Sequence, residues 1–362
     1  MKHIKILIPV MMVLFLFSCS AFAVGMGFGM RGMGMGGTGI AIANDIVSAA
    51  YFNPAGLMYA PDFETQLSAA GNPDIVTAAG NKNFLADNFD ADMNINNAAA
   101  SSSFGLSLRK VGISVLTNAT GSLSHNGGST LSGGANAQAI AMVPVTFGTV
   151  LSKPETFPST AVGMNIKSVQ LYGGGLNILL GAAAQSQLAG TGMGFDFGIQ
   201  TKLTPTISYG LVVRNIATSY TVTNKTQLGT IDGSGTFTAG GLETSSKSTN
   251  TIAPEVGIGI GFGIPITGTL IACDLENYSY PDNGNANRSK TANDLHIGIE
   301  QGILFNALML RVGYFNYAPT DDTFYTCGVG MNAGLLSIGI AEANSQKDST
   351  ASSLLVQIGV EL

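Results

Sequence analysis

Between Val256 and Ile264 the chain alternates strictly between an apolar residue and glycine. Successive side chains of a β-strand point to opposite faces, so this stretch would place its apolar side chains on one face and only glycine on the other. A helix would scatter the same glycines around its surface. The pattern therefore predicts a strand with one apolar face and one bare face, which leaves open space or lets another part of the chain approach closely.

The same period of two recurs along most of the chain after residue 60. Long connections, the longest predicted at 218–249, alternate with tight turns, which is typical of outer-membrane barrels whose termini lie in the periplasm. An even number of strands is what a closed single-chain barrel of this kind requires. The pattern predicts fourteen strands, at 63–72, 98–108, 111–118, 138–152, 158–171, 190–203, 206–217, 250–264, 268–276, 292–303, 307–315, 322–332, 335–343 and 352–362.

Composition favours a membrane barrel over a soluble protein. Only 10% of the 362 residues are charged and 48 are glycine, whereas a soluble domain carries about 25% charge. No stretch after the first 23 residues reaches the roughly 18 unbroken apolar residues of a membrane helix. A soluble β-sandwich is the alternative, but it would not need so little charge. We therefore expect an all-β fold, a 14-stranded antiparallel transmembrane β-barrel with an N-terminal plug (hatch) segment in the lumen.

The first 23 residues have the pattern of a secretory signal peptide. Lys2 and Lys5 precede an apolar run at 6–17, and a small-x-small cleavage pattern closes the segment at Ala23. A lipoprotein signal centred on Cys19 is the alternative. In both cases the chain is exported, and we expect it in the outer membrane of a Gram-negative bacterium.

Residues 24–60 separate the signal peptide from the barrel predicted from residue 61 onward. A glycine- and methionine-rich run leads into Asp45–Leu57, which contains Asn53-Pro54-Ala55. Proline keeps the preceding residue out of the helical region, so a short helix across 46–52 must break there. The segment is either an ordinary helix-to-loop break or a plug. We expect the division 1–23 signal peptide, 24–60 plug, and 61–362 barrel.

The sequence offers no catalytic, metal or cofactor motif. A G-x-G-x-x-G run at 34–39 has no strand before it, so it does not predict a dinucleotide site. Cys273 and Cys327 form no CxxC, and no metal site is expected. On one strand, His296 and Glu300 would lie roughly 13 Å apart, too far for an acid–base pair. The net charge of -6 argues against nucleic acid. We expect no enzyme activity and no cofactor.

Charged residues with apolar neighbours are the candidates for the lumen. Two interpretations are open for them: they balance one another and hold the plug, or Arg214 and Arg311 bind a carboxylate head group. Asp274 and Glu276 share the same pattern. The lumen-facing candidates are Lys167, Asp196, Arg214, His296, Glu300 and Arg311.

The segment GMGGTGIAIANDIVSAAYFNPAGL at 34–57 resembles the N-terminal segment of the FadL/TodX-type outer-membrane transporters and of their PorV-like and TraF-like relatives. The pieces at 163–172, 190–200 and 210–220 also resemble that superfamily. The resemblance implies a fourteen-stranded barrel with a hatch inside. Residue by residue, it carries over only to Asn53, Pro54 and Ala55, the plug motif.

Two functions follow as expectations. The first is passive uptake of hydrophobic small molecules, of the long-chain fatty acid or aromatic hydrocarbon class; the alternative is a PorV-like or TraF-like barrel that docks secretion or conjugation proteins. The expected partners are outer-membrane lipid, a hydrophobic ligand, the barrel-assembly machinery and, in the alternative, other envelope proteins. For transport, we expect sideways exit into the membrane near the third strand, predicted to be short at Val111–Asn118.

Overall fold

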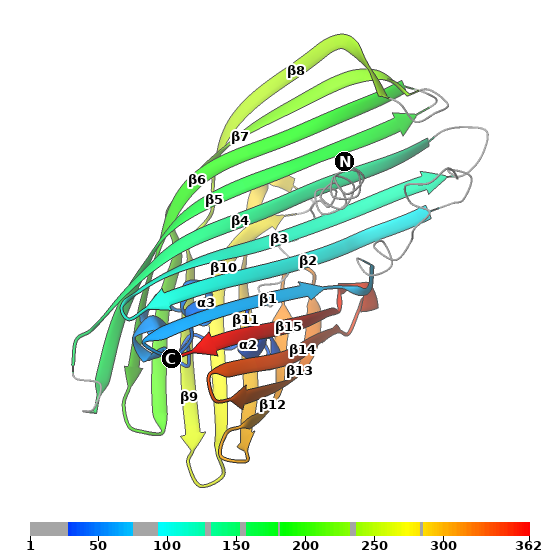
Figure 1. Cartoon of the computed structure of the whole chain (residues 1–362). Helices are drawn as coiled ribbons and strands as arrows, with labels where there is room; N and C mark the ends of the chain where they lie inside the picture. The colour runs from blue at the N-terminus through cyan, green and yellow to red at the C-terminus, as the bar shows by residue number, and fades with distance from the viewer. Residues whose placement is uncertain are drawn as a thin grey trace, which may run out of the picture.

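In the computed structural model, antiparallel strands form one sheet around a short helical N-terminal segment (Figure 1). The structure describes residues 28–74, 93–126, 132–152, 157–179, 182–231, 237–282 and 285–362. The predicted signal peptide and residues 24–27 lie outside these ranges. The helical elements are α2 (Met30–Gly34), α3 (Ile46–Tyr51), η1 (Pro54–Tyr59) and η3 (Ser349–Ala351). The strands are β1 (Phe63–Gly71), β2 (Met93–Leu108), β3 (Val111–Asn126), β4 (Ser132–Val150), β5 (Ser159–Leu179), β6 (Ala182–Lys202), β7 (Ile207–Ile231), β8 (Phe237–Thr251), β9 (Glu255–Ile264), β10 (Thr269–Asp282), β11 (Asn285–Ile303), β12 (Leu308–Tyr317), β13 (Asp322–Ala333), β14 (Leu336–Ser345) and β15 (Ser353–Glu361).

The sheet closes on itself into a barrel. β1 pairs with both β2 and β15, and β6 pairs with β7, so the ladder runs around the whole wall. β8 and β9 share one position, because the first part of β7 pairs with β9 and its later part pairs with β8. The fifteen strands therefore occupy fourteen positions, and the predicted 14-stranded antiparallel barrel is confirmed.

Several strands are longer than predicted. The residues at 218–249, expected to be the longest connection, instead continue β7 to Ile231 and form most of β8. β8 is exposed on both faces, β7 beyond residue 218 is mostly exposed or half-buried, and the hairpin carries Ser, Thr, Asn and Lys. A ladder with water on both sides needs no alternation of apolar and polar residues, so the period of two is lost there. Figure 1 shows β2 to β8 extending well beyond the shorter β12 to β15.

The expectation of a short third strand is also wrong. β3 has 16 residues and pairs with β2 from one end to the other, apart from one irregularity opposite Ile95 to Ala98. Its ladder with β4 lapses at Ser114 and Val115 and resumes in the same register. Pro144 lies opposite this lapse by the register, and proline has no N–H to donate to a ladder.

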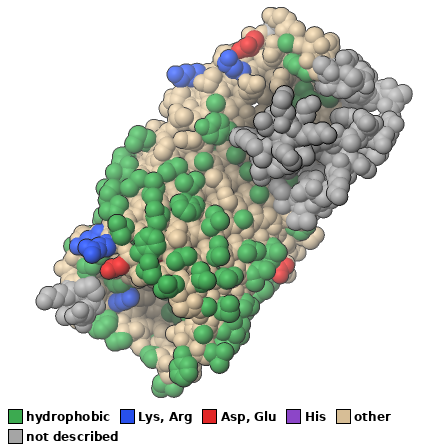
Figure 2. All heavy atoms as spheres, viewed as in Figure 1, with side chains coloured by type: hydrophobic (Ala, Val, Ile, Leu, Met, Phe, Trp, Pro, Cys, Tyr) green, Lys and Arg blue, Asp and Glu red, His purple; other side chains and the backbone are tan. Residues whose placement is uncertain are grey.

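The outer surface carries a band of apolar side chains. On β9, β13 and β14, exposed apolar residues alternate with buried or small residues that face inward. Figure 2 shows hydrophobic side chains over the middle and lower surface, with charged side chains at the upper end and at the lower left. None of the helices within the described ranges has the length and apolar character that crossing a membrane would take. The core therefore lies inside the barrel, around residues 28–60.

Candidate functional site: the N-terminal segment inside the barrel

Local hydrogen bonds shape the segment. Asp45 caps α3 by accepting from the backbone N–H of Ser48 at 2.8 Å. The helix ends at Tyr51, and Pro54 opens η1 at a position where its missing N–H is not needed. Asn53 caps η1, with its Oδ1 accepting from the N–H of Ala55 at 3.1 Å. The predicted break at Asn53-Pro54 is therefore the junction of two capped turns.

The Asn53 side chain also ties the segment to the wall. Its Nδ2 donates to the carbonyl of Ile40 at 2.7 Å and to the carbonyl of Ile199, on β6, at 3.0 Å. Asn53 is fully buried. Because an amide has one acceptor oxygen and two N–H donors, a single side chain here joins two parts of the segment to the barrel.

Glycines on the inward faces of the strands make room for this contact. A Cβ on Gly163 would lie 2.2 Å from the carbonyl carbon of Pro54, and one on Gly198 would lie 2.0 Å from Oδ1 of Asn53. On β9, the bare face predicted from the alternation lies against the segment: Cβ atoms on Gly257 and Gly261 would come within 2.6 Å of the side chains of residues 40 and 42. The glycines thus allow backbone to pack against wall without a gap.

Glu300, on β11, clamps the start of the segment. It binds Arg31 of α2 through two hydrogen bonds, of 3.1 and 3.0 Å, and it accepts from Nε of Arg311 at 2.7 Å. Arg31 also donates to the carbonyl of Ile42 at 3.0 Å. A carboxylate buried between two guanidinium groups is strongly held, because each side compensates the other away from water.

Three further ion pairs, formed by two cations, lie behind α3. Lys167 donates to Asp196 at 2.6 Å, and Asn165 links that pair to the segment by donating to the carbonyl of Ala50 at 2.9 Å.

Arg214 pairs with Glu276 at 2.7 Å and with Glu255 at 3.2 Å. It also donates to the carbonyl of Tyr51 at 3.4 Å. All of these arginine and lysine charges are compensated by carboxylates.

Asp274 and His296 bind the backbone of the segment between α2 and α3. Asp274 accepts from the N–H groups of Gly39 and Ile40 at 2.7 and 2.9 Å. Nδ1 of His296 lies 2.7 Å from the carbonyl oxygen of Gly36. His296 and Glu300 thus bind different parts of the segment.

Sequence reasoning missed several of the residues that hold the segment. Arg31 stands in a run of glycine and methionine that shows no hydrophobic period, so no sequence pattern marks it as a contact residue. The others are polar residues on the inward faces of strands, where the period of two could have found them: Glu64 accepts from the N–H of Ile46, Gln357 from Met30, and Thr326 from Gly36, while Gln200 donates to the carbonyl of Ala43.

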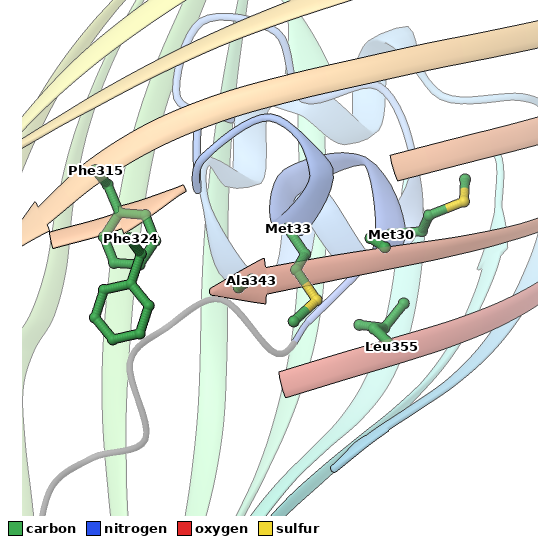
Figure 3. Close-up of a cluster of buried hydrophobic side chains, with 7 residues drawn as sticks. Met30, Met33, Phe315, Phe324, Ala343 and Leu355 are labelled. Atoms are coloured by element: carbon green, nitrogen blue, oxygen red, sulfur yellow. The ribbon is translucent and has the colours of Figure 1, made fainter. Parts of the chain in front are cut away.

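An apolar cluster also packs α2 against the barrel wall. Met30 and Met33 point from the helix toward the wall, where Phe315, Phe324 and Leu355 are buried (Figure 3). The rings of Phe315 and Phe324 stack with their centroids 4.7 Å apart. Methionine adapts to irregular apolar surfaces, which suits a short helix resting on several strands. A second cluster packs α3 against Leu116 of β3.

No group of three His, Cys, Asp or Glu residues in the described ranges could hold a metal ion. Cys273 and Cys327 are free thiols on outward faces of β10 and β13. The site is therefore a buried hydrogen-bonded and ion-paired assembly between the N-terminal segment and the inner wall.

These features define the molecule as a fourteen-position barrel with an N-terminal segment packed in its lumen. No family model matches the sequence, and no curated protein matches it in sequence. Solved structures do match. The Pseudomonas putida toluene transporter TodX has a TM-score of 0.61 at 14% identity, over 93% of this chain and 99% of that one. At this identity the likeness establishes the fold alone.

Two other structures show the same fold. A channel described as the CymD monoaromatic hydrocarbon channel has a TM-score of 0.60 at 12% identity, over 93% of this chain and 97% of that one. A Pseudomonas aeruginosa FadL homologue has a TM-score of 0.56 at 12% identity, over 95% of this chain and 98% of that one. The chain thus has the fold of the FadL/TodX-type barrels over nearly its whole length.

Proposed function

We propose that this protein lies in the outer membrane and carries out passive uptake of hydrophobic small molecules. The fold shared with hydrocarbon channels supports a channel role, and the apolar outer band supports a membrane location. Residues 28–60 act as a plug that closes the axial path. Driving force comes from partition of the cargo into apolar surroundings, which needs no energy source.

The ion pairs formed by the inward charges bear on the class of substrate. Arg214 and Arg311, the two candidates for a carboxylate head group, already face Glu276 and Glu300 at 2.7 Å. A fatty-acid head group would have to displace a buried protein carboxylate. The lumen is therefore better suited to an uncharged cargo, and we propose neutral aromatic hydrocarbons as the substrate class.

Uptake by intact cells tests this proposal. Cells that lack their own hydrophobic-compound channels would express either this protein or an empty vector, and the accumulation of labelled toluene, oleate and a disaccharide would be measured. The proposal expects faster toluene accumulation with little change for the disaccharide. Toluene entry equal to that of the vector control would refute it, and faster entry of oleate alone would refute the neutral substrate class.

We further propose that cargo leaves sideways through the wall. The lapse between β3 and β4 at Ser114 and Val115 supports this location, and Ile46 of α3 lies near it, 2.2 Å from a Cβ built on Gly112, two residues before the lapse. The apolar cluster formed by α3 and Leu116 contains no charged residue, so the cargo would pass along an apolar surface. Apolar cargo that enters the bilayer directly never meets the aqueous periplasm.

A disulfide staple tests the exit. Val115→Cys and Val143→Cys face each other by the register, so oxidation should close the lapse; Leu123→Cys with Ala135→Cys is the matched control, on a part of the same ladder that is intact. Both pairs would be built with Cys273 and Cys327 changed to serine. We expect oxidation to slow uptake only for the first pair. Equal uptake under oxidising and reducing conditions would end the lateral-exit proposal.

The docking alternative stays a prediction. Its own test is purification of the barrel in mild detergent from its native membrane, followed by identification of any stoichiometric envelope protein that co-purifies. Toluene uptake by the barrel alone in proteoliposomes would favour transport over docking.

A further inference from the structure

At the end of the barrel that carries its tight turns, three neighbouring turns expose apolar side chains. They follow β9, β11 and β13 and display Ile266, Leu304, Phe305 and Leu335, which we call the apolar turn patch. Ile266 is 97% exposed and Phe305 is 107% exposed. The turns are adjacent, because Gly302 donates to the carbonyl of Gly268 at 2.9 Å. Residues 265–268, 304–307 and 334–335 contain no charge.

The backbone of the middle turn is strained in a way that keeps these side chains outside. Leu304, Phe305 and Asn306 have φ angles of 53°, 57° and 65°. Left-handed backbone is uncommon for residues other than glycine, and it is disfavoured for bulky side chains. Three such residues in succession hold a leucine and a phenylalanine away from the protein. Strain of this kind points to a use for the exposed side chains.

Between the patch and the apolar band lies a short polar row whose hydrogen bonds are made within the protein. The hydroxyl of Thr269 donates to Gln301 at 2.6 Å and lies 2.7 Å from the hydroxyl of Thr267. Nε2 of Gln301 donates to the carbonyls of Thr267 and Gly302. Polar groups that face lipid must be satisfied internally, and this row meets that condition. The patch is thus continuous with a surface that lipid can cover.

The opposite side of the same end is different. The tight turn between β2 and β3 carries Arg109 and Lys110, both exposed. Charged side chains at that height favour water and lipid head groups over acyl chains. Figure 2 shows charged side chains at the lower left and hydrophobic ones at the lowest tip of the molecule. The rim is therefore asymmetric in charge: the three turns of the patch carry none, whereas the turn between β2 and β3 carries two exposed cations.

We propose that the apolar turn patch inserts into the phospholipid leaflet at this end of the barrel, so that the wall from β9 to β14 sits deeper in the membrane than the wall carrying Arg109 and Lys110. The inference rests on the proposed membrane location. The occupant of the patch is the acyl-chain and glycerol region of the bilayer, because the patch continues the apolar band and carries no charge with which to select a protein partner.

The absence of tryptophan from the sequence gives a clean test. Single-tryptophan variants would be reconstituted in phosphatidylcholine vesicles: Phe305→Trp and Ile266→Trp in the patch, Ile297→Trp in the apolar band, and Lys110→Trp in the charged turn. Quenching by brominated acyl chains reports contact with lipid, and quenching by iodide reports contact with water. Heat-modifiable gel migration identifies the variants that have folded.

The proposal expects both patch variants to show blue-shifted emission and lipid quenching at least half as strong as that of Ile297→Trp, with iodide quenching several-fold below that of Lys110→Trp. Patch variants as accessible to iodide as Lys110→Trp would overturn the inference, while lipid quenching of Ile297→Trp would still support the membrane location. Iodide quenching of all four variants would refute both the inference and the membrane location.

Discussion

Helix α2 and the turn η1 lie in the same barrel, yet the walls around them hold them by different chemistry. Around α2, the carboxylate of Glu300 faces two arginines, and two methionines fill the space against β12 to β15. Around η1, the wall presents glycines, and the contacts are neutral hydrogen bonds from Asn53 and Tyr59 to backbone carbonyls. We call these two sets of wall contacts the α2 seat and the η1 seat. Glycines of β13 and β14 also face α2, at Gly328, Gly330 and Gly339, so what distinguishes the α2 seat is its ion-paired carboxylate and its methionines.

The difference predicts how strongly mutations should destabilise each half of the segment. A buried charge that loses its partner is strongly destabilising, whatever the shape of the pocket. A neutral hydrogen bond contributes less, and its loss matters because the remaining carbonyls are left unpaired. Changes at the α2 seat should therefore have larger effects than single changes at the η1 seat.

The largest effect is expected for Glu300→Gln. The substitution keeps the shape but leaves the buried Arg311 and the half-buried Arg31 without a carboxylate, which should lower the free energy of unfolding by about 3–5 kcal/mol. Urea unfolding in detergent micelles, followed by circular dichroism, measures this. The matched control is Glu243→Gln, which removes an exposed pair with Lys225. A loss at Glu300 no larger than at Glu243 would show that the ionic clamp does not hold α2.

A smaller effect is expected for Asn53→Ala. It removes the cap of η1 and leaves the carbonyls of Ile40 and Ile199 without their donor, at a loss of about 1–3 kcal/mol. Limited proteolysis should then cut within the segment sooner than in the native chain. Asn332→Ala, at an exposed position, is the control. Equal protease resistance of the two variants would contradict the role given to Asn53.

The smallest effect is expected for Tyr59→Phe. The tyrosine hydroxyl lies 2.9 Å from the carbonyl of Ser159 and 3.2 Å from that of Gln200. Its loss should lower the free energy of unfolding by about 0.5–1.5 kcal/mol. Tyr325→Phe, on the exposed outer face, serves as the control and should change little. A loss at Tyr59 as large as that of Glu300→Gln would erase the distinction between the two seats.

The sequence predicts those parts of the fold in which two environments alternate. β9 shows this best, because its apolar and glycine faces meet the outside and the segment, respectively. β8 escaped prediction because both of its faces are exposed, so its residues carry no alternation. The inward charges at Lys167, Asp196 and Arg214 could be found from their apolar neighbours. Which of the inward charges pair with one another could not be predicted, because pairing depends on register across strands.

Arg31 shows a second limit of sequence reasoning. Its guanidinium joins Glu300 across 269 positions of sequence, and nothing local marks it as different from the glycines and methionines around it. The NPA motif was visible because proline and asparagine have fixed local consequences. The contact that Asn53 makes with Ile199 of β6 has no local signal, because the two residues are far apart in the sequence.

The plug is the central claim, and single-channel conductance tests it most directly. The full chain and a variant lacking residues 24–60 would be inserted into planar bilayers, after heat-modifiable migration has shown that both are folded. If the segment fills the lumen as its contacts indicate, the deletion should raise the conductance several-fold. A deletion variant that is folded and conducts no more than the full chain would contradict the plug.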